Sequence, residues 1–299
     1  MNVLITGGTG LIGRKLVHAL KQDNANITVL TRNSNKAVSI LGSHISFIQK
    51  LSLSCIENQD VVINLAGEPI ANKRWSKGQK DKICYSRWNI TKQLTELINK
   101  AENPPSLFIS GSAIGIYGRQ PNTPIDETFT QYNQEFTHEV CEKWEKLALE
   151  ATSDATRVVV LRTGIVLDAN AGVLAKMLLP FRLGMGGKVS SGQQVMSWIH
   201  IEDMISAILH IQNTPSFKGV ANITSPYPVT NDTFSQTLAE ILKRPAIFNT
   251  PAIILKMLFG EMAELLLFGQ HVLPRKLIHS DFHFTYPTID KALKNLLDK

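Results

Sequence analysis

Residues 1–13 read MNVLITGGTGLIG, and this stretch decides how the rest of the chain folds. The apolar residues 3–5 predict a strand, and apolar positions at helical spacing from residue 11 predict a helix directly after the glycines. A strand, a glycine turn and a helix in this order are the setting of a dinucleotide-binding fingerprint. Glycines in such a turn let the backbone approach a pyrophosphate, which the free N–H groups of the helix stabilise. We therefore expect Gly7, Gly10 and Gly13 to hold a cofactor.

The composition is that of a protein with a sizeable buried core, since 43% of the 299 residues are apolar. The short apolar run at the start has no basic segment before it and does not match a signal peptide. Residues 251–268 form the longest apolar stretch, but they include Lys256, Glu261 and Glu264. Each charge at a bilayer centre would cost about 2.5–3.5 kcal/mol. We expect a buried amphipathic helix there instead of a membrane span, and no membrane partner.

The cysteines and the distribution of charge further restrict the class of protein and its partners. The three cysteines, Cys55, Cys84 and Cys141, lack metal-ligand spacing and indicate reduced thiols in a cytoplasmic protein with no metal site. The formal net charge of +6 comes partly from residues 73–92, where seven Lys and Arg side chains are opposed only by Asp81. We expect a solvated helix face, the alternative being a surface that attracts a phosphorylated ligand. No nucleic-acid partner is expected, because no recognition motif accompanies the charge.

Strand and helix patterns alternate through the first part of the chain. Helical segments are expected at residues 75–100 and 135–152, and further strands at residues 27–30, 45–48, 60–65, 106–110 and 157–162. This alternation predicts an α/β fold, a Rossmann-type doubly wound parallel sheet with right-handed crossovers. We assign residues 1–165 to this domain.

The last part of the chain has a mixed pattern. Residues 166–299 predict a smaller mixed α/β domain on the substrate side, with the chain partly interleaved between the two domains. A strand is expected at residues 220–224, and helices at residues 172–183, 230–242 and 288–297. Arg182 and Lys188 flank a glycine turn in this part. They either bind an anionic substrate or are solvated side chains.

The end of the second strand predicts which cofactor binds. A doubly wound fold places the adenosine ribose at this point, where an acidic residue selects NAD and an arginine accommodates a 2′-phosphate. This chain has Thr31-Arg32-Asn33 there, with Lys36 shortly after. A guanidinium suits the phosphate because its planar fork pairs with it bidentately. The sequence therefore predicts NADP(H) over NAD(H).

Several motifs together resemble a known family. The chain is similar to the extended short-chain dehydrogenase/reductases, the NAD(P)-dependent epimerase/dehydratase family, at residues 6–13, 64–67, 110–118, 161–164 and 198–203. Residues 249–297 are similar to a small C-terminal domain of unknown function, which marks an atypical subfamily whose members are called epimerase family proteins. The resemblance covers nearly the whole chain.

The resemblance implies a cofactor site with named residues. NADP(H) would be held by Gly7, Gly10, Leu11, Ile12, Thr31 and Arg32, with Thr9 and Gly13 in the same turn. Leu65 and Ala66 would line the adenine and ribose region. By analogy with the subfamily, Arg87 and Arg162 would also face the cofactor, with Lys82 as a further candidate. The charge pattern alone does not select Arg87 from its basic neighbours.

The chain departs from the family where acid–base chemistry is expected. Family enzymes use a Tyr and a Lys four residues later, the Lys lowering the pKa of the phenol so that it exchanges a proton with substrate. Alignment sets Thr137 at the Tyr position and Cys141 at the Lys position. None of the five tyrosines has Lys at the fourth following residue. The usual dyad is therefore missing.

Other side chains could take the place of the missing Tyr and Lys. Ser112 lies near the family's hydrogen-bonding Ser or Thr, with a capping role as the alternative, and His200 either contacts substrate or anchors a turn. We name Ser112 and His200 as the catalytic candidates. His138 is expected on the surface, Tyr117 in a structural role, Cys141 as an inert thiol, and Asp203 as a cap or first-turn acid of a helix.

Two functions remain open on this sequence. The first is an NADP(H)-dependent oxidoreductase or a nucleoside-diphosphate-sugar epimerase/dehydratase that acts on an unidentified small molecule with an unusual proton relay. The second is a non-catalytic protein that binds and senses NADP(H). The family also implies a possible homodimer through the long helices.

Overall fold

The structure is a computed structural model that describes residues 1–298. Its centre is a sheet of seven parallel strands. In spatial order these strands are β11 (Gly219–Ile223), β6 (Arg157–Thr163), β5 (Leu107–Ala113), β4 (Val61–Asn64), β1 (Asn2–Thr6), β2 (Asn26–Leu30) and β3 (Ser46–Ile48). The strand order reverses next to β1, which is where a doubly wound sheet opens a crevice for ligands. The predicted α/β fold is confirmed.

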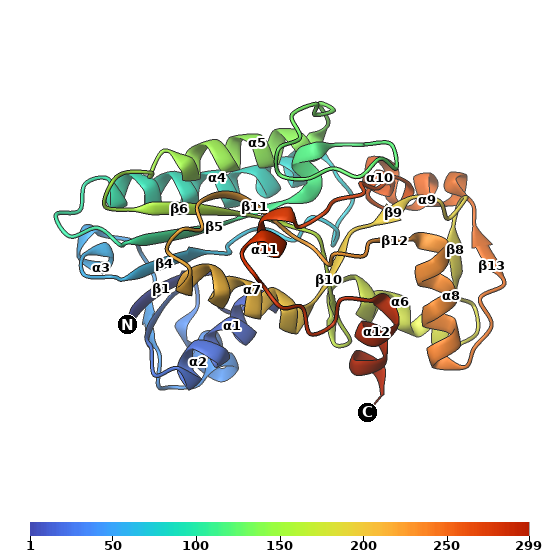
Figure 1. The fold of residues 1–299 in the computed structure, drawn as a ribbon, viewed down its shortest axis with the longest axis horizontal. Coiled ribbons are helices and arrows are strands. Elements are labelled where there is room, and N and C mark those ends of the chain that lie inside the picture. Colours follow the sequence, from blue (N-terminus) through green and yellow to red (C-terminus); the bar gives the residue numbers. More distant parts are fainter. Residues whose placement is uncertain (299) are drawn as a thin grey trace.

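Helices cover both faces of this sheet (Figure 1). One face carries α1 (Leu11–Gln22), α2 (Ser34–Leu41) and α7 (Ile201–Asn213), and the other carries α3 (Leu53–Ile56), α4 (Lys77–Ile98) and α5 (Phe136–Leu149). The strands are therefore buried on both sides, which explains their nearly continuous apolar sequences. In β4 all residues, including the polar Asn64, are buried.

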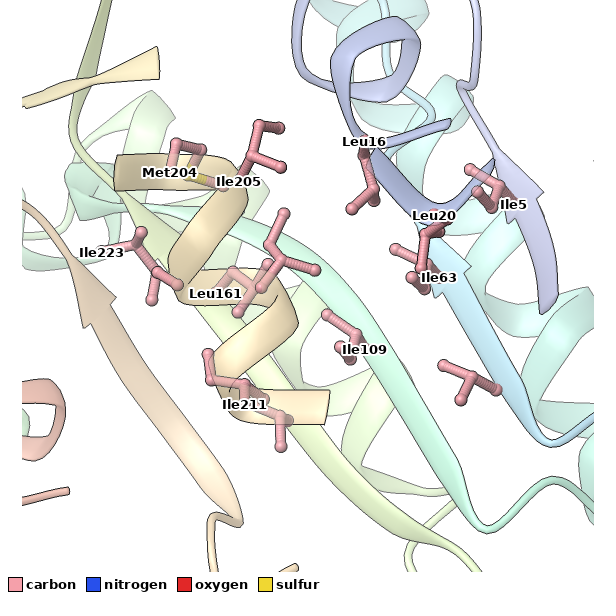
Figure 2. Close-up of a cluster of buried hydrophobic side chains, with 14 of the residues drawn as sticks. Ile5, Leu16, Leu20, Ile63, Ile109, Leu161, Met204, Ile205, Ile211 and Ile223 are labelled. Atoms are coloured by element: carbon pink, nitrogen blue, oxygen red, sulfur yellow. The ribbon is translucent and has the colours of Figure 1, made fainter. Parts of the chain in front are cut away.

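The core under α1 and α7 is built from residues far apart in sequence. Figure 2 shows Leu16 and Leu20 of α1 beside Ile63, and Ile211 of α7 near Leu161 and Ile109. These side chains are fully buried or nearly so. Each such aliphatic group stabilises the fold by about 1.5–3 kcal/mol. The apolar positions that the sequence predicts for α1 are therefore the ones that pack into this core.

The chain passes between the large sheet and a smaller lobe more than once. After β6 it enters a smaller lobe and then returns, because α7 packs on α1 and β11 pairs in parallel with β6. It returns again at α11 (Arg275–His279), whose Leu277 joins the core under α1 and α7. Residues from both parts of the chain therefore build the large sheet and its covering.

The smaller lobe has its own apolar core. Its helices are α6 (Gly172–Arg182), α8 (Asn231–Leu242), α9 (Ala252–Phe259), η2 (Gly260–Ala263), α10 (Glu264–Leu267) and α12 (Ile289–Leu297). Three two-stranded sheets complete it: β10 (Trp198–His200) with β7 (Ile165–Asp168), β12 (Val229–Thr230) with β9 (Val195–Met196), and β13 (Phe248–Thr250) with β8 (Gly187–Val189). Buried Trp198, Phe234 and Phe181 form the centre of its core.

The structure corrects the expectation of one buried amphipathic helix over residues 251–268. Helix α9 ends at Gly260, whose φ of 59° is a backbone conformation that favours glycine. A short 3₁₀ turn and a separate short helix follow. Of the residues in α9 only Leu255 is buried, and Ile253 and Met257 are 71% and 74% exposed. The apolar pattern was therefore misread as a core helix. Within residues 1–298 no helix is long and apolar enough to cross a bilayer.

Candidate functional site

The glycine turn after β1 has the close backbone contacts that its sequence predicts. Gly7 has a φ of 71°, and a Cβ atom built on it would lie 2.5 Å from the carbonyl oxygen of Leu65. A Cβ on Gly13 would lie 2.3 Å from the carbonyl oxygen of Gly7. Only hydrogen fits at both positions, so the two glycines let β1, β4 and α1 approach one another.

The start of α1 is open to an anion. Gly10 is the N-cap and has no side chain to satisfy the first N–H groups, and the first turn contains no acidic residue. Thr9 and Gly10 are exposed, while Leu11 and Ile12 are half-buried. Free N–H groups and the positive end of the helix dipole favour a phosphate at this place.

The residues after β2 form a second part of the site. Thr31 continues the strand, since its N–H donates to the Ile48 carbonyl at 2.9 Å. The Asn33 side chain caps α2 by accepting from the Lys36 N–H at 3.0 Å. Arg32 lies between these fixed positions, is exposed, and forms no ion pair with any residue from 1 to 298. Its guanidinium is therefore free for an anionic ligand.

Arg87 brings a half-buried cation to the end of β4. Its Nη1 donates to the Ile83 carbonyl at 2.9 Å, and its guanidinium carbon lies 5.2 Å from the Trp144 ring centroid. Burial lowers the pKa of Arg87. The group contacts Gly67 so closely that a Cβ there would lie 2.9 Å from its Cζ. In the part of the chain that the structure describes, Arg87 forms no ion pair, so a ligand anion would stabilise it.

Leu65 and Ala66 lie beside the glycine turn, as expected for residues that line a cofactor. The Leu65 N–H donates to the Thr6 carbonyl at 3.1 Å, which extends the β1–β4 pairing to this point. Lys82 is different, because it is exposed on α4 five residues before Arg87. Positions five apart on a helix point about 140° apart. Contact between Lys82 and a cofactor remains a prediction.

Arg162 takes part in a buried polar network under α5. Strand register sets Ser112, Arg162 and Asn222 side by side on β5, β6 and β11. Arg162 donates to both carboxylate oxygens of Glu145, with Nε–Oε1 at 3.0 Å and Nη2–Oε2 at 2.8 Å. Burial lowers the pKa of Arg162, but the bonds and charge of Glu145 outweigh it and raise the pKa overall. Cofactor contact by Arg162 remains a prediction.

The same network holds the hydroxyl groups of Ser112 and Tyr117. Ser112 Oγ donates to Glu145 Oε1 at 2.7 Å, and Tyr117 donates to Asn222 Oδ1 at 2.7 Å. Burial raises the pKa of Tyr117 to about 12, so its phenol stays neutral. Ser112 is 5% exposed and lies within β5, not at a helix cap. Its hydroxyl is therefore already bonded inside the protein.

Glu145 is the member of this network that sequence reasoning missed. It lies on α5 four residues after Cys141 and is 6% exposed. A buried face of α5 at helical spacing, running through Cys141, Glu145 and Ala148, was the available signal. An acidic residue on such a face requires a buried cation, and Arg162 supplies it.

The positions that align with the missing dyad have other surroundings. Burial raises the pKa of Cys141 to about 12, so its thiol stays protonated and inert, as expected. Thr137 is half-buried against Gly115. His138 is a correction: we expected it on the surface, but it is 4% exposed and its Nδ1 donates to the Ile116 carbonyl at 2.6 Å.

His200 caps a helix. Its Nδ1 accepts from the Glu202 N–H at 3.1 Å at the start of α7, and its ring centroid lies 4.0 Å from that of Tyr286. Burial lowers its pKa, which keeps the ring neutral. A neutral ring is required for Nδ1 to accept this bond. The turn-anchoring role weighed for His200 is present in the structure, and contact with a substrate remains a prediction.

Asp203 is a fully buried acid in the first turn of α7. Its two carboxylate oxygens accept from the Thr285 and Tyr286 N–H groups at 2.8 and 2.9 Å. An asparagine at position 203 would place its side-chain NH₂, which is itself a donor, against one of these two backbone N–H groups. We expect a loss of about 1–3 kcal/mol in unfolding free energy, measured by thermal denaturation. Glu202→Gln, at the exposed neighbouring position, should leave the melting temperature unchanged, and equal melting of both variants would contradict this role.

Two clefts lie outside the glycine turn. One, of about 920 Å³, lies between α4 and α5 and is lined by Trp75, Tyr85 and Phe136 among others. The second, of about 510 Å³, includes Glu145 and Arg162 in its lining. Neither includes the turn at residues 7–13. No group of three His, Cys, Asp or Glu side chains suited to a metal is present within residues 1–298.

Comparison with known proteins places these features in a family. Residues 3–224 match the NAD dependent epimerase/dehydratase family, and residues 250–296 match a domain of unknown function, DUF1731. An epimerase family protein of Staphylococcus saprophyticus is 38% identical over 294 residues, covering 98% of each chain. The chloroplastic SDR39U1 homolog of Arabidopsis thaliana is 38% identical, covering 99% of this chain and 87% of that protein.

Solved structures agree with this fold. The human epimerase family protein SDR39U1, solved with NADPH, matches with a TM-score of 0.90 and 32% identity over 100% of both chains. A nucleoside-diphosphate sugar epimerase of Corynebacterium glutamicum matches with a TM-score of 0.79 and 27% identity, covering 99% of this chain and 58% of that one.

Proposed function

Since this chain belongs to the NAD dependent epimerase/dehydratase family, we propose that it binds NADP(H) at the glycine turn. The observation that carries the proposal is the open start of α1, where Gly7 and Gly13 leave no space for a side chain and the first N–H groups have no side-chain cap. The pyrophosphate rests on these N–H groups, and Arg32 pairs with the 2′-phosphate. The NADPH in the human SDR39U1 structure supports the choice of the phosphorylated cofactor.

The proposed chemistry is hydride exchange with a small molecule, as an oxidoreductase or an epimerase/dehydratase. The nicotinamide supplies the hydride chemistry when bound. The chain's own residues bind and orient the cofactor: the glycine turn holds the phosphates, Leu65 and Ala66 lie beside it, and Arg87 offers a cation at the end of β4. Ser112 lies near the position of the family's hydrogen-bonding Ser or Thr, and its hydroxyl donates to Glu145 Oε1 at 2.7 Å, which gives its proton an acceptor.

A second candidate function rests on a specific observation. The hydroxyl of Ser112 and the Nδ1 of His200 are both buried and bonded within the protein. The other ring nitrogen of His200, Nε2, has no hydrogen-bond partner among the described residues, but it is buried as well. A chain whose acid–base candidates are shielded from solvent in this way suits a non-catalytic protein that binds NADP(H) and reports it to a partner. Both candidates share the cofactor site and differ in turnover.

Turnover distinguishes the two candidates. The protein is incubated with NADPH and a panel of ketones, aldehydes and nucleotide sugars, and the absorbance of the reduced nicotinamide is followed. Oxidation of NADPH that stops in a Ser112→Ala variant supports the enzyme and its relay. Tight NADPH binding without consumption by any compound favours the non-catalytic candidate.

Arg32 is tested by charge reversal. Arg32→Asp should weaken NADPH binding by about 10- to 100-fold, because a charge-assisted hydrogen bond contributes roughly 1.5–3 kcal/mol. NADH binding should not weaken, since NADH has no 2′-phosphate. Lys21→Asp, at the exposed far end of α1, makes the same charge change and serves as the control in a fluorescence titration. Unchanged NADPH affinity in Arg32→Asp would overturn this role.

A further inference from the structure

Two segments of the small lobe expose an unusual amount of apolar surface. They are residues 179–189 and 243–258, and they lie side by side because β8 pairs in parallel with β13. Of nineteen exposed large apolar side chains in the described residues, nine lie in these segments. They are Leu179, Leu183, Met185, Ile247, Phe248, Ile253, Ile254, Met257 and Leu258. We call this set the apolar tip. Apolar surface concentrated in this way marks an interaction site.

The charged side chains within the two segments have a single sign. The two segments contain no Asp or Glu and five cations: Arg182, Lys188, Lys243, Arg244 and Lys256. All except Lys188 are exposed, and Lys188 lies 3.8 Å from Asp232 of α8. The partner of this surface must therefore be apolar at its centre and anionic at its rim.

This pattern selects among possible occupants. In a symmetric dimer the same patch faces itself, so the cations of two copies would oppose one another. None of the nine side chains lines either of the two clefts described above. Figure 1 shows α9 and β13 at the end of the small lobe, away from the N-terminus. An exposed apolar surface with a basic rim fits a flat anionic layer.

The sequence predicts no membrane partner, but the exposed apolar surface leads us to the opposite inference: we propose that the apolar tip binds the surface of a bilayer that contains anionic phospholipids. Side chains of α9 such as Ile253 and Met257 enter the region between headgroups and acyl chains. Arg244 and Lys256 at the rim pair with the phosphates. Short amphipathic helices with basic residues bind membranes in this peripheral way, and each added cation strengthens the attraction to anionic lipid. None of the nine side chains of the tip belongs to the glycine turn at residues 7–13.

Vesicle flotation tests the proposal on the full chain. The protein should float with vesicles of mixed phosphatidylcholine and phosphatidylglycerol and remain unbound with pure phosphatidylcholine. The double variant Ile253→Glu, Met257→Glu should reduce partitioning to the mixed vesicles at least about tenfold. A matched control, Val38→Glu with Ile40→Glu, places the same charges on exposed apolar positions of α2 and should bind as the parent does.

A second arm tests the rim. Arg244→Glu with Lys256→Glu should also weaken binding at least about tenfold, and added salt should weaken binding by the parent. Melting temperature should be unchanged in every variant, and NADPH affinity should be unchanged in the tip and rim variants, which shows that the lobes are intact. Absence of flotation by the parent overturns the proposal. So does a tip variant that leaves vesicle binding unchanged while it converts a dimer to a monomer in light scattering, which would make the tip an interface between copies.

Discussion

Gly13→Ala should sharply weaken NADPH binding, because among the glycines of this turn Gly13 is the one where a Cβ atom has least room. The added Cβ would lie 2.3 Å from the Gly7 carbonyl oxygen and 2.7 Å from the Gly8 Cα, and backbone atoms cannot move aside cheaply. Helix α1 must retreat from the turn, which carries its N–H groups away from the phosphates. We expect at least a tenfold loss of NADPH affinity and a stability loss of about 1–3 kcal/mol.

Gly78→Ala is the matched control for this variant. Gly78 is also in the first turn of a helix, α4, but a Cβ there would meet no atom within 4 Å. Alanine should be neutral or slightly stabilising at this position. Calorimetric titration with NADPH and thermal melting compare the two variants. Wild-type affinity and melting in Gly13→Ala would show that α1 does not need to lie against the turn.

Of the single substitutions that we propose, Arg162→Met should be the most destabilising. It leaves the Glu145 carboxylate buried with Ser112 as its remaining hydrogen-bond donor among the network described above. Removing one partner of a buried ion pair costs about 3–5 kcal/mol. The melting temperature should fall accordingly, and Lys146→Met, at the exposed neighbouring position on α5, should not change it.

The double variant separates the ion pair from general packing. Arg162→Met combined with Glu145→Met removes both charges and leaves Ser112 to find another acceptor. It should melt at a higher temperature than Arg162→Met alone, because no uncompensated charge remains. Additive losses in the double variant would indicate that the two side chains act by packing and not as a pair.

The sequence pattern predicts the part of the site that residues close together in sequence form. The glycine spacing, the apolar strand before it and the helical pattern after it all belong to residues 1–22, and the structure has each of them. The position of Arg32 follows from where β2 ends. In these places the backbone itself forms the site, and sequence patterns report backbone conformation directly.

Contacts between elements that are far apart in sequence could not be predicted from such patterns. The Glu145–Arg162 pair joins α5 to β6, and its existence depends on strand register and helix rotation. His138 is buried because the loop before α5 folds over it beside Ile116. The stretch at 251–268 is as apolar as a core helix, but Gly260 breaks it and no other element of the described chain covers Ile253 and Met257 of α9. Apolar sequence predicts burial only where another surface is available.

The most direct test of the account is a calorimetric titration of the unmodified chain with NADPH and, separately, with NADH. We expect both to bind, with NADPH at least about tenfold tighter because Arg32 pairs with its additional phosphate. Equal affinity for the two would contradict the role of Arg32. Failure to bind either would contradict the cofactor site at residues 7–13 on which the proposed function depends.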